Sequence, residues 1–87
     1  MAHVDFRVYD LGQQAYVVGA TATATWQTGS ATEVSTAPLG KITWEVPPEE
    51  TAITIDITAT GYCPYHEDNR RILLSGGWTY LYVEPGC

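Results

Sequence analysis

Short runs of alternating apolar and polar residues follow one another along the chain, a pattern typical of β-strands that bury one face. Residues with turn chemistry, chiefly Gly, Pro and Asp, separate these runs at intervals of roughly 8–12 residues, which favours a sandwich or a barrel. We predict one all-β domain over residues 1–87, a seven-stranded antiparallel β-sandwich of the prealbumin or immunoglobulin-like type. The strands are expected at residues 4–9, 20–26, 32–36, 41–46, 51–60, 70–74 and 78–83.

Six segments are expected to connect these strands, among them a loop at Gln27–Ala31 that contains Gly29 and a tight turn at Pro38–Gly40. Asp10–Gln14 predicts a turn, because Asp can bond its own backbone and Gly accepts a positive φ. Pro47–Glu50 predicts a corner, since proline cannot donate to a ladder. Gly61–Arg71 is predicted to be a polar loop, and Ser75–Gly77 a hairpin turn that pairs the last two strands. The longest run is predicted to be the central strand, with its isoleucines in the core.

Charge and hydropathy exclude several classes of partner. The net charge of −6 opposes the phosphate backbone that a nucleic-acid-binding protein must neutralise. No apolar run approaches the ~20 residues of a membrane helix. The first residues, Met1–Asp5, lack the basic flank and apolar core of a signal peptide. We therefore expect no nucleic-acid partner, no membrane partner and no export through such a signal.

Turn and strand-end motifs recur in a characteristic order along the chain. They are Asp10-Leu11-Gly12, Gly19-Ala20, Leu39-Gly40, Pro47-Pro48 and Gly61-Tyr62. With them the chain resembles, over nearly its whole length, the carboxypeptidase-regulatory-like domain, a transthyretin-type β-sandwich. The resemblance implies a fold that usually has no catalytic residues of its own, in which Tyr62 is a fold element and not a site residue.

Carboxylates are the first candidates for chemistry, because a pair can serve as acid and base. The five candidate carboxylates are expected at turns or at outward strand positions, where nothing supplies the buried environment that shifts a pKa. We interpret them as solubilising groups and expect no catalytic residue, no cofactor and no enzyme activity. They are Asp5, Asp10, Glu33, Glu45 and Asp56.

Cys63 and His66 have the spacing of two metal ligands, and Cys87 could add a third. Structural zinc usually needs four ligands, so we expect no metal site. Two alternatives stay open for the cysteines. Cys63 and Cys87 form a disulfide, which would close a loop of ~25 residues, or both are free thiols.

Outward aromatic and Thr side chains are the candidates for an interface. Rigid aromatic rings bury a large area at low entropic cost, and a ladder of short Thr side chains lets another backbone approach. Aromatic rings also stack on sugars, so glycan binding is the alternative interpretation. The interface candidates are Thr21, Thr23 and Thr25 on the second strand, Tyr65 in the polar loop, and Tyr80 and Tyr82 on the last strand.

These observations favour a non-catalytic structural or interaction protein that contacts copies of itself or a larger assembly. A small, acidic sandwich without an export signal suits a bacteriophage virion, and the specific expectation is a capsid decoration protein made in the host cytoplasm. The alternative is a carbohydrate-binding, adhesion or spacer module of a secreted multidomain protein, which would place the chain outside the cell.

Overall fold

The computed structural model describes residues 2–71 and 78–86, which form eight β-strands and no helix. The all-β prediction is therefore confirmed for the described residues. The strand beyond the predicted seven is β2, a two-residue strand within a segment read as a connection. The strands are β1 (Ala2–Asp10), β2 (Ala15–Tyr16), β3 (Thr21–Trp26), β4 (Gly29–Val34), β5 (Lys41–Val46), β6 (Ala52–Thr58), β7 (Tyr65–Arg71) and β8 (Trp78–Tyr82).

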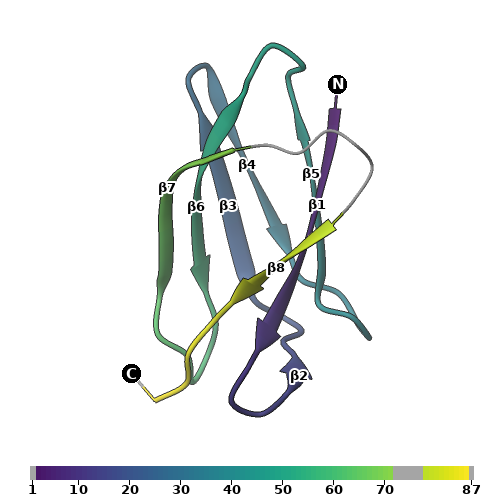
Figure 1. Ribbon diagram of the computed structural model, residues 1–87, viewed down its shortest axis with the longest axis vertical. Helices are drawn as coiled ribbons and strands as arrows, with labels where there is room; N and C mark the ends of the chain where they lie inside the picture. Colours follow the sequence, from purple (N-terminus) through teal and green to yellow (C-terminus); the bar gives the residue numbers. More distant parts are fainter. Residues whose placement is uncertain (1, 72–77, 87) are drawn as a thin grey trace.

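The strands form two sheets (Figure 1), which pack against each other through their apolar faces. One sheet contains β2, β1 and β5 in that order, with β8 also paired to β1, and the other has the order β4-β3-β6-β7. β6 lies between β3 and β7, so the longest alternating run is an interior strand, as predicted. β1 and β8 run parallel, and the prediction of a wholly antiparallel sandwich is wrong at this pair.

The core lies between the sheets and follows the alternation of the sequence. Small alanines of β3 face the large rings and branched side chains of the other layer, where the Phe6 and Trp44 rings are 5.5 Å apart. This close packing makes one continuous apolar cluster. The buried apolar residues are Val4, Phe6, Val8, Val17, Ala20, Ala22, Ala24, Ile42, Trp44, Val46, Ile53, Ile55, Ile57, Leu81 and Val83.

Two predicted loops are shorter than expected. β4 begins at Gly29 and not at Thr32, because the Trp26 ring packs over Gly29 and closes a tight hairpin with β3. The predicted polar loop at Gly61–Arg71 is wrong from residue 65 onward, where β7 pairs with β6. β7 is an edge strand with a register shift, and its inward positions hold polar side chains, so it lacks the expected apolar alternation.

The predicted hairpin between the last two strands is also wrong. β7 belongs to one sheet and β8 to the other, where β8 pairs with β1. The proposed turn at Ser75–Gly77 and residues 72–74 of the predicted strand lie outside the described residues. Local turn chemistry could not identify β1 as the partner of β8.

Asp10 is not the solvent-exposed turn residue that the sequence predicted. Its exposure is 0%, and its two carboxylate oxygens accept hydrogen bonds from the Tyr62 hydroxyl at 2.9 Å and the Gln13 backbone N–H at 3.1 Å. Burial of a carboxylate requires such partners. The contact joins the end of β1 to the segment after β6, in agreement with the expectation that Tyr62 serves the fold.

Candidate functional site

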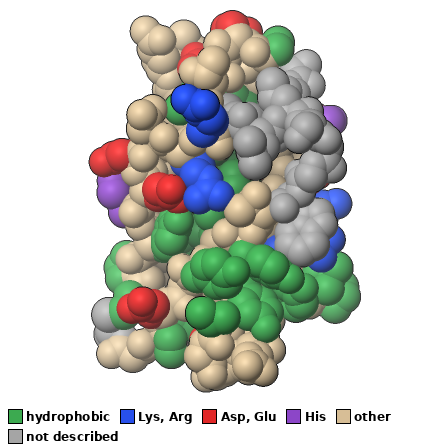
Figure 2. Space-filling model, viewed as in Figure 1, with side chains coloured by type: hydrophobic (Ala, Val, Ile, Leu, Met, Phe, Trp, Pro, Cys, Tyr) green, Lys and Arg blue, Asp and Glu red, His purple; other side chains and the backbone are tan. Residues whose placement is uncertain are grey.

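Four tyrosines gather on the outer face of the sheet that contains β1, β2 and β8. We call Tyr9, Tyr16, Tyr80 and Tyr82 the tyrosine patch. Tyr9 is the register partner of Tyr16 on β2 and of Tyr82 on β8, so the two flanking strands place their rings on either side of it. Figure 2 shows hydrophobic side chains collected over the lower parts of β1 and β8 on this face.

The local sequence explains why these side chains point outward. Val8 on β1 and Leu81 on β8 are buried, so their neighbours Tyr9, Tyr80 and Tyr82 take the opposite face. The turn after β1 then returns the chain as β2 and brings Tyr16 beside Tyr9. The patch is thus built from a hairpin near the start of the chain, β1 and β2, and from one strand distant in the sequence, β8.

The rings of the patch pack against one another. The centroid of Tyr9 lies 5.1 Å from those of Tyr16 and Tyr80, and 6.2 Å from that of Tyr82. Tyr16 and Tyr80 are 6.1 Å apart at an interplanar angle of 30°, and Tyr80 and Tyr82 are 5.7 Å apart at 31°. These separations lie in the range of favourable aromatic pairs. The rings of the patch therefore restrict one another's side-chain conformations.

Hydroxyl contacts and exposure distinguish the members of the patch. The hydroxyls of Tyr16 and Tyr80 are hydrogen-bonded at 3.2 Å, and this bond is the main cause that raises the pKa of Tyr80. Tyr82 is 48% exposed, whereas the other three rings are half-buried by their neighbours. Tyr82 is therefore the most exposed ring of the patch.

The predicted Thr face lies on the other sheet. Thr21 and Thr25 are exposed on the outer face of β3, and Thr23 is half-buried, with its hydroxyl bonded to that of Thr32 at 3.0 Å. This face and the tyrosine patch belong to the two opposite outer surfaces of the sandwich. The structure therefore separates residues that the sequence analysis grouped as one interface.

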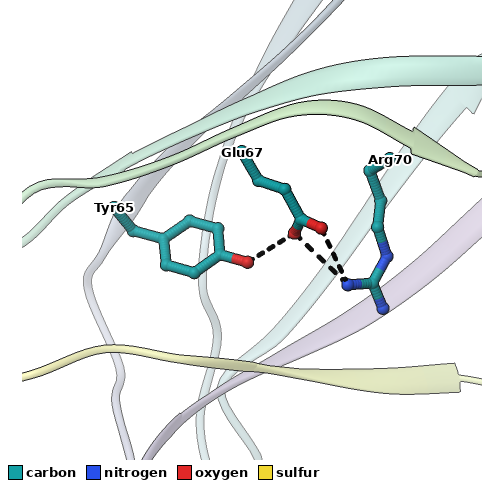
Figure 3. A network of polar contacts seen from close by, with 3 residues as sticks. All are labelled: Tyr65, Glu67 and Arg70. Atoms are coloured by element: carbon teal, nitrogen blue, oxygen red, sulfur yellow. Dashed lines mark hydrogen bonds and ion pairs between the residues drawn. The ribbon is translucent and has the colours of Figure 1, made fainter.

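Tyr65 differs from the other predicted interface residues. Its ring packs against the core, and its hydroxyl donates to Glu67 at 2.5 Å (Figure 3). Glu67 also accepts two hydrogen bonds from Arg70, at 3.2 and 3.3 Å. Burial first, and then the bond to Glu67, raises the pKa of Tyr65 to about 12. This network lies at the margin of the core, where Tyr65 is half-buried, and the interface role of Tyr65 stays a prediction.

His66 is bound by carboxylates and does not form a ligand pair with Cys63. Its Nδ1 lies 2.5 Å from Asp56 and its Nε2 lies 3.1 Å from Asp68, which raises the pKa of His66, chiefly through the bond to Asp56. Cys63 is bonded in a disulfide, and Cys87 lies outside the described residues. Within the described part of the chain, no group of three or more His, Cys, Asp or Glu side chains is arranged to hold a metal ion.

Half of the tyrosine patch could be identified from the sequence. Tyr80 and Tyr82 follow from the alternation of the last strand, and the structure places both on an outer face. Tyr9 also alternates with buried residues, but it was not singled out. Tyr16 lies on a two-residue strand, which is too short to show an alternation of apolar and polar side chains.

Comparisons with known proteins add no family. No protein-family model matches the chain, and a search of curated proteins found no match. The resemblance to the carboxypeptidase-regulatory-like domain therefore stays a prediction. Over residues 2–71 and 78–86, no helix is long and apolar enough to span a membrane.

Proposed function

We propose that the chain is a non-catalytic interaction protein that binds a partner protein through the tyrosine patch. The observation that supports this proposal is the convergence of four tyrosines from three strands on one outer sheet face. Tyr is enriched at protein interfaces, where its ring supplies contact area and its hydroxyl keeps a polar contact. The family resemblance, which implies a domain without its own catalytic residues, agrees with this function.

Preorganisation supports binding through this face. Ring-to-ring packing restricts the side chains before binding, so less conformational entropy is lost when a partner orders them. Arg7 is the register partner of Tyr80 and adds a cationic group beside the rings. Tyr and Arg are the residue types that most often dominate binding energy at interfaces.

The predicted setting in a virion is one form of this proposal. A capsid decoration protein needs a rigid fold and a contact surface, and the sandwich with its tyrosine patch supplies both. A phage particle that incorporates the chain would test this setting directly. Incorporation should fall when Tyr82 is replaced by Ala and should stay unchanged for Tyr82→Phe, which keeps the ring.

Glycan binding is the second candidate, and the ring orientations favour it. Tyr80 is inclined by only 30–31° to both Tyr16 and Tyr82, and the exposed ring of Tyr82 offers a face on which the apolar side of a sugar could stack. Such a platform is shared by sugar-binding and protein-binding surfaces. Tyr82→Ala should therefore weaken either function. The property that is lost, association with a protein or binding of a glycan, distinguishes the two.

Light scattering of the purified chain, combined with a glycan array, tests these functions. An oligomer that dissociates in Tyr82→Ala but persists in Tyr65→Phe supports a protein contact through the patch. A monomer whose glycan binding is lost in the same variant supports the second candidate. An oligomer that survives Tyr82→Ala and dissociates in Thr23→Lys would assign the contact to the opposite face and overturn the proposal.

A further inference from the structure

We propose that Tyr16 and Tyr80 form an oxidative cross-linking site, at which a one-electron oxidant joins the two rings by a carbon–carbon bond. Their phenolic oxygens are 3.2 Å apart, and the rings are stacked at 6.1 Å with an interplanar angle of 30°. The hydrogen bond holds the carbons ortho to each hydroxyl close together, so that a small rotation of either side chain can bring two of them into contact. This modification goes beyond the proposed binding function.

Ring distance alone does not select this pair, since Tyr80 lies closer to Tyr9 and Tyr82 than to Tyr16, but the hydrogen bond between the two hydroxyls does. The Tyr62 and Tyr65 hydroxyls donate to the carboxylates of Asp10 and Glu67, which places them in separate polar networks. Tyr9 lies 5.1 Å from both members of the pair. A radical formed on Tyr9 can therefore be reduced by electron transfer from Tyr16 or Tyr80, so oxidation at Tyr9 can also reach the hydrogen-bonded pair.

The reaction balances with a peroxide as the oxidant. Each tyrosine loses one electron to the oxidant and its phenolic proton to solvent, which leaves two phenoxyl radicals. The radicals combine at one ortho carbon of each ring, and the hydrogen on each of these carbons then moves to the oxygen to restore the phenols. The chain loses two hydrogen atoms in total, and one hydrogen peroxide becomes two waters.

The bond would join two distant parts of the chain within one sheet. Tyr16 lies on β2 and Tyr80 on β8, the two strands that flank Tyr9 of β1. A covalent link across this span restricts the unfolded chain and so stabilises the fold in the chain-entropy model. It would also fix two rings of the tyrosine patch.

The test is oxidation of dilute protein by hydrogen peroxide with a haem peroxidase. We expect dityrosine fluorescence and a monomer that is lighter by two hydrogen atoms. After disulfide reduction and trypsin digestion, peptide 8–41 should be joined to peptide 72–87, and fragmentation should locate the bond at Tyr16 and Tyr80. Tyr16→Phe and Tyr80→Phe should each lose this linked peptide.

Phe variants of other tyrosines serve as matched controls, because they keep the ring and remove one hydroxyl. Tyr65→Phe tests a tyrosine outside the patch and Tyr82→Phe one inside it, and both should retain the linked peptide. Circular dichroism checks that every variant is folded. The proposal is wrong if the intramolecular link survives in Tyr16→Phe or Tyr80→Phe, if oxidation yields only links between chains, or if no dityrosine forms.

Discussion

At the scale of the residue, the buried carboxylate of Asp10 shows how one polar contact can support the fold. The Tyr62 hydroxyl donates to it at 2.9 Å, and this bond is the main cause that raises the pKa of Tyr62. Tyr62→Phe would leave one oxygen of a fully buried carboxylate without that donor. We expect the free energy of unfolding to fall by about 1.5–3 kcal/mol, as for other hydrogen bonds to charged groups.

Denaturant titration measures this loss, and Tyr82→Phe is the control because its ring is exposed. A loss for Tyr62→Phe no greater than that for Tyr82→Phe would contradict the structural role of the contact. Asp10 is the last residue of β1 and directly precedes the turn, whereas the sequence placed it within the turn and could not show its burial. That burial depends on Tyr62, which is distant in the chain and reaches Asp10 only in the folded molecule.

His66 predicts a pH dependence at the same scale. Its folded pKa is raised above the usual value of about 6.5 in unfolded chains. The stabilisation is therefore complete below the unfolded pKa and is lost as the pH rises through the folded pKa. NMR titration of the imidazole should show a lower pKa in both Asp56→Asn and Asp68→Asn, since each carboxylate contributes a hydrogen bond and a coulombic attraction that raise it. An unchanged pKa in either variant would contradict this assignment.

At the scale of the element, the sequence is most informative where turn residues enclose a clear alternation. β5 has the predicted bounds, Lys41–Val46, because Pro38-Leu39-Gly40 precedes it and Pro47-Pro48 follows. β7 was missed because it is an edge strand whose inward side chains are polar. The parallel partner of β8 is set by how the two sheets pack, which no local pattern encodes. For the same reason, the sequence predicts Tyr80 and Tyr82 as interface residues but does not predict that Tyr9 and Tyr16 lie beside them.

Gly40 marks the point where β1, β5 and the chain after β2 meet. Its φ is +60°, and a Cβ here would lie 2.7 Å from the Val8 carbonyl oxygen and 2.8 Å from that of Val17. Gly19 also has a positive φ, +88°, but a Cβ there would meet nothing within 4 Å. Replacement by Ala should cost about 1–2 kcal/mol at Gly19 for the left-handed backbone. Gly40→Ala should cost clearly more, because backbone atoms must also move.

Thermal or chemical unfolding of the two variants measures the difference. Because both substitutions add one methyl group at a positive φ, the excess loss in Gly40→Ala reports the close backbone contact. Equal losses in the two variants would show that this junction relaxes without cost, contrary to the geometry.

At the scale of the whole molecule, the end of the chain is tied back to the segment after β6. The Cys63 backbone N–H donates to Glu84 at 2.7 Å, and Cys63 is also bonded in a disulfide. The chain contains one other cysteine, Cys87. Cys63→Ser should lower the free energy of unfolding by about 3 kcal/mol, the value typical of a loop of this length. Reductant should destabilise the original chain to a similar extent and leave the variant unchanged. A reductant-insensitive stability would contradict this role.

The sandwich presents two different outer surfaces, and this arrangement determines how the chain could act in an assembly. The tyrosine patch lies on one sheet and the Thr face of β3 on the other, so a molecule held between two neighbours would use both.

Tyr82→Ala and Thr23→Lys alter separate surfaces, and effects at distant sites usually add. In a particle that incorporates the chain, we expect each variant to weaken binding and the double variant to lose the sum of the two free energies. Circular dichroism should show the isolated variants folded. Binding that responds to Tyr82→Ala alone would restrict the contact to the tyrosine patch, whereas binding that responds only to Thr23→Lys would reverse the assignment of the binding face.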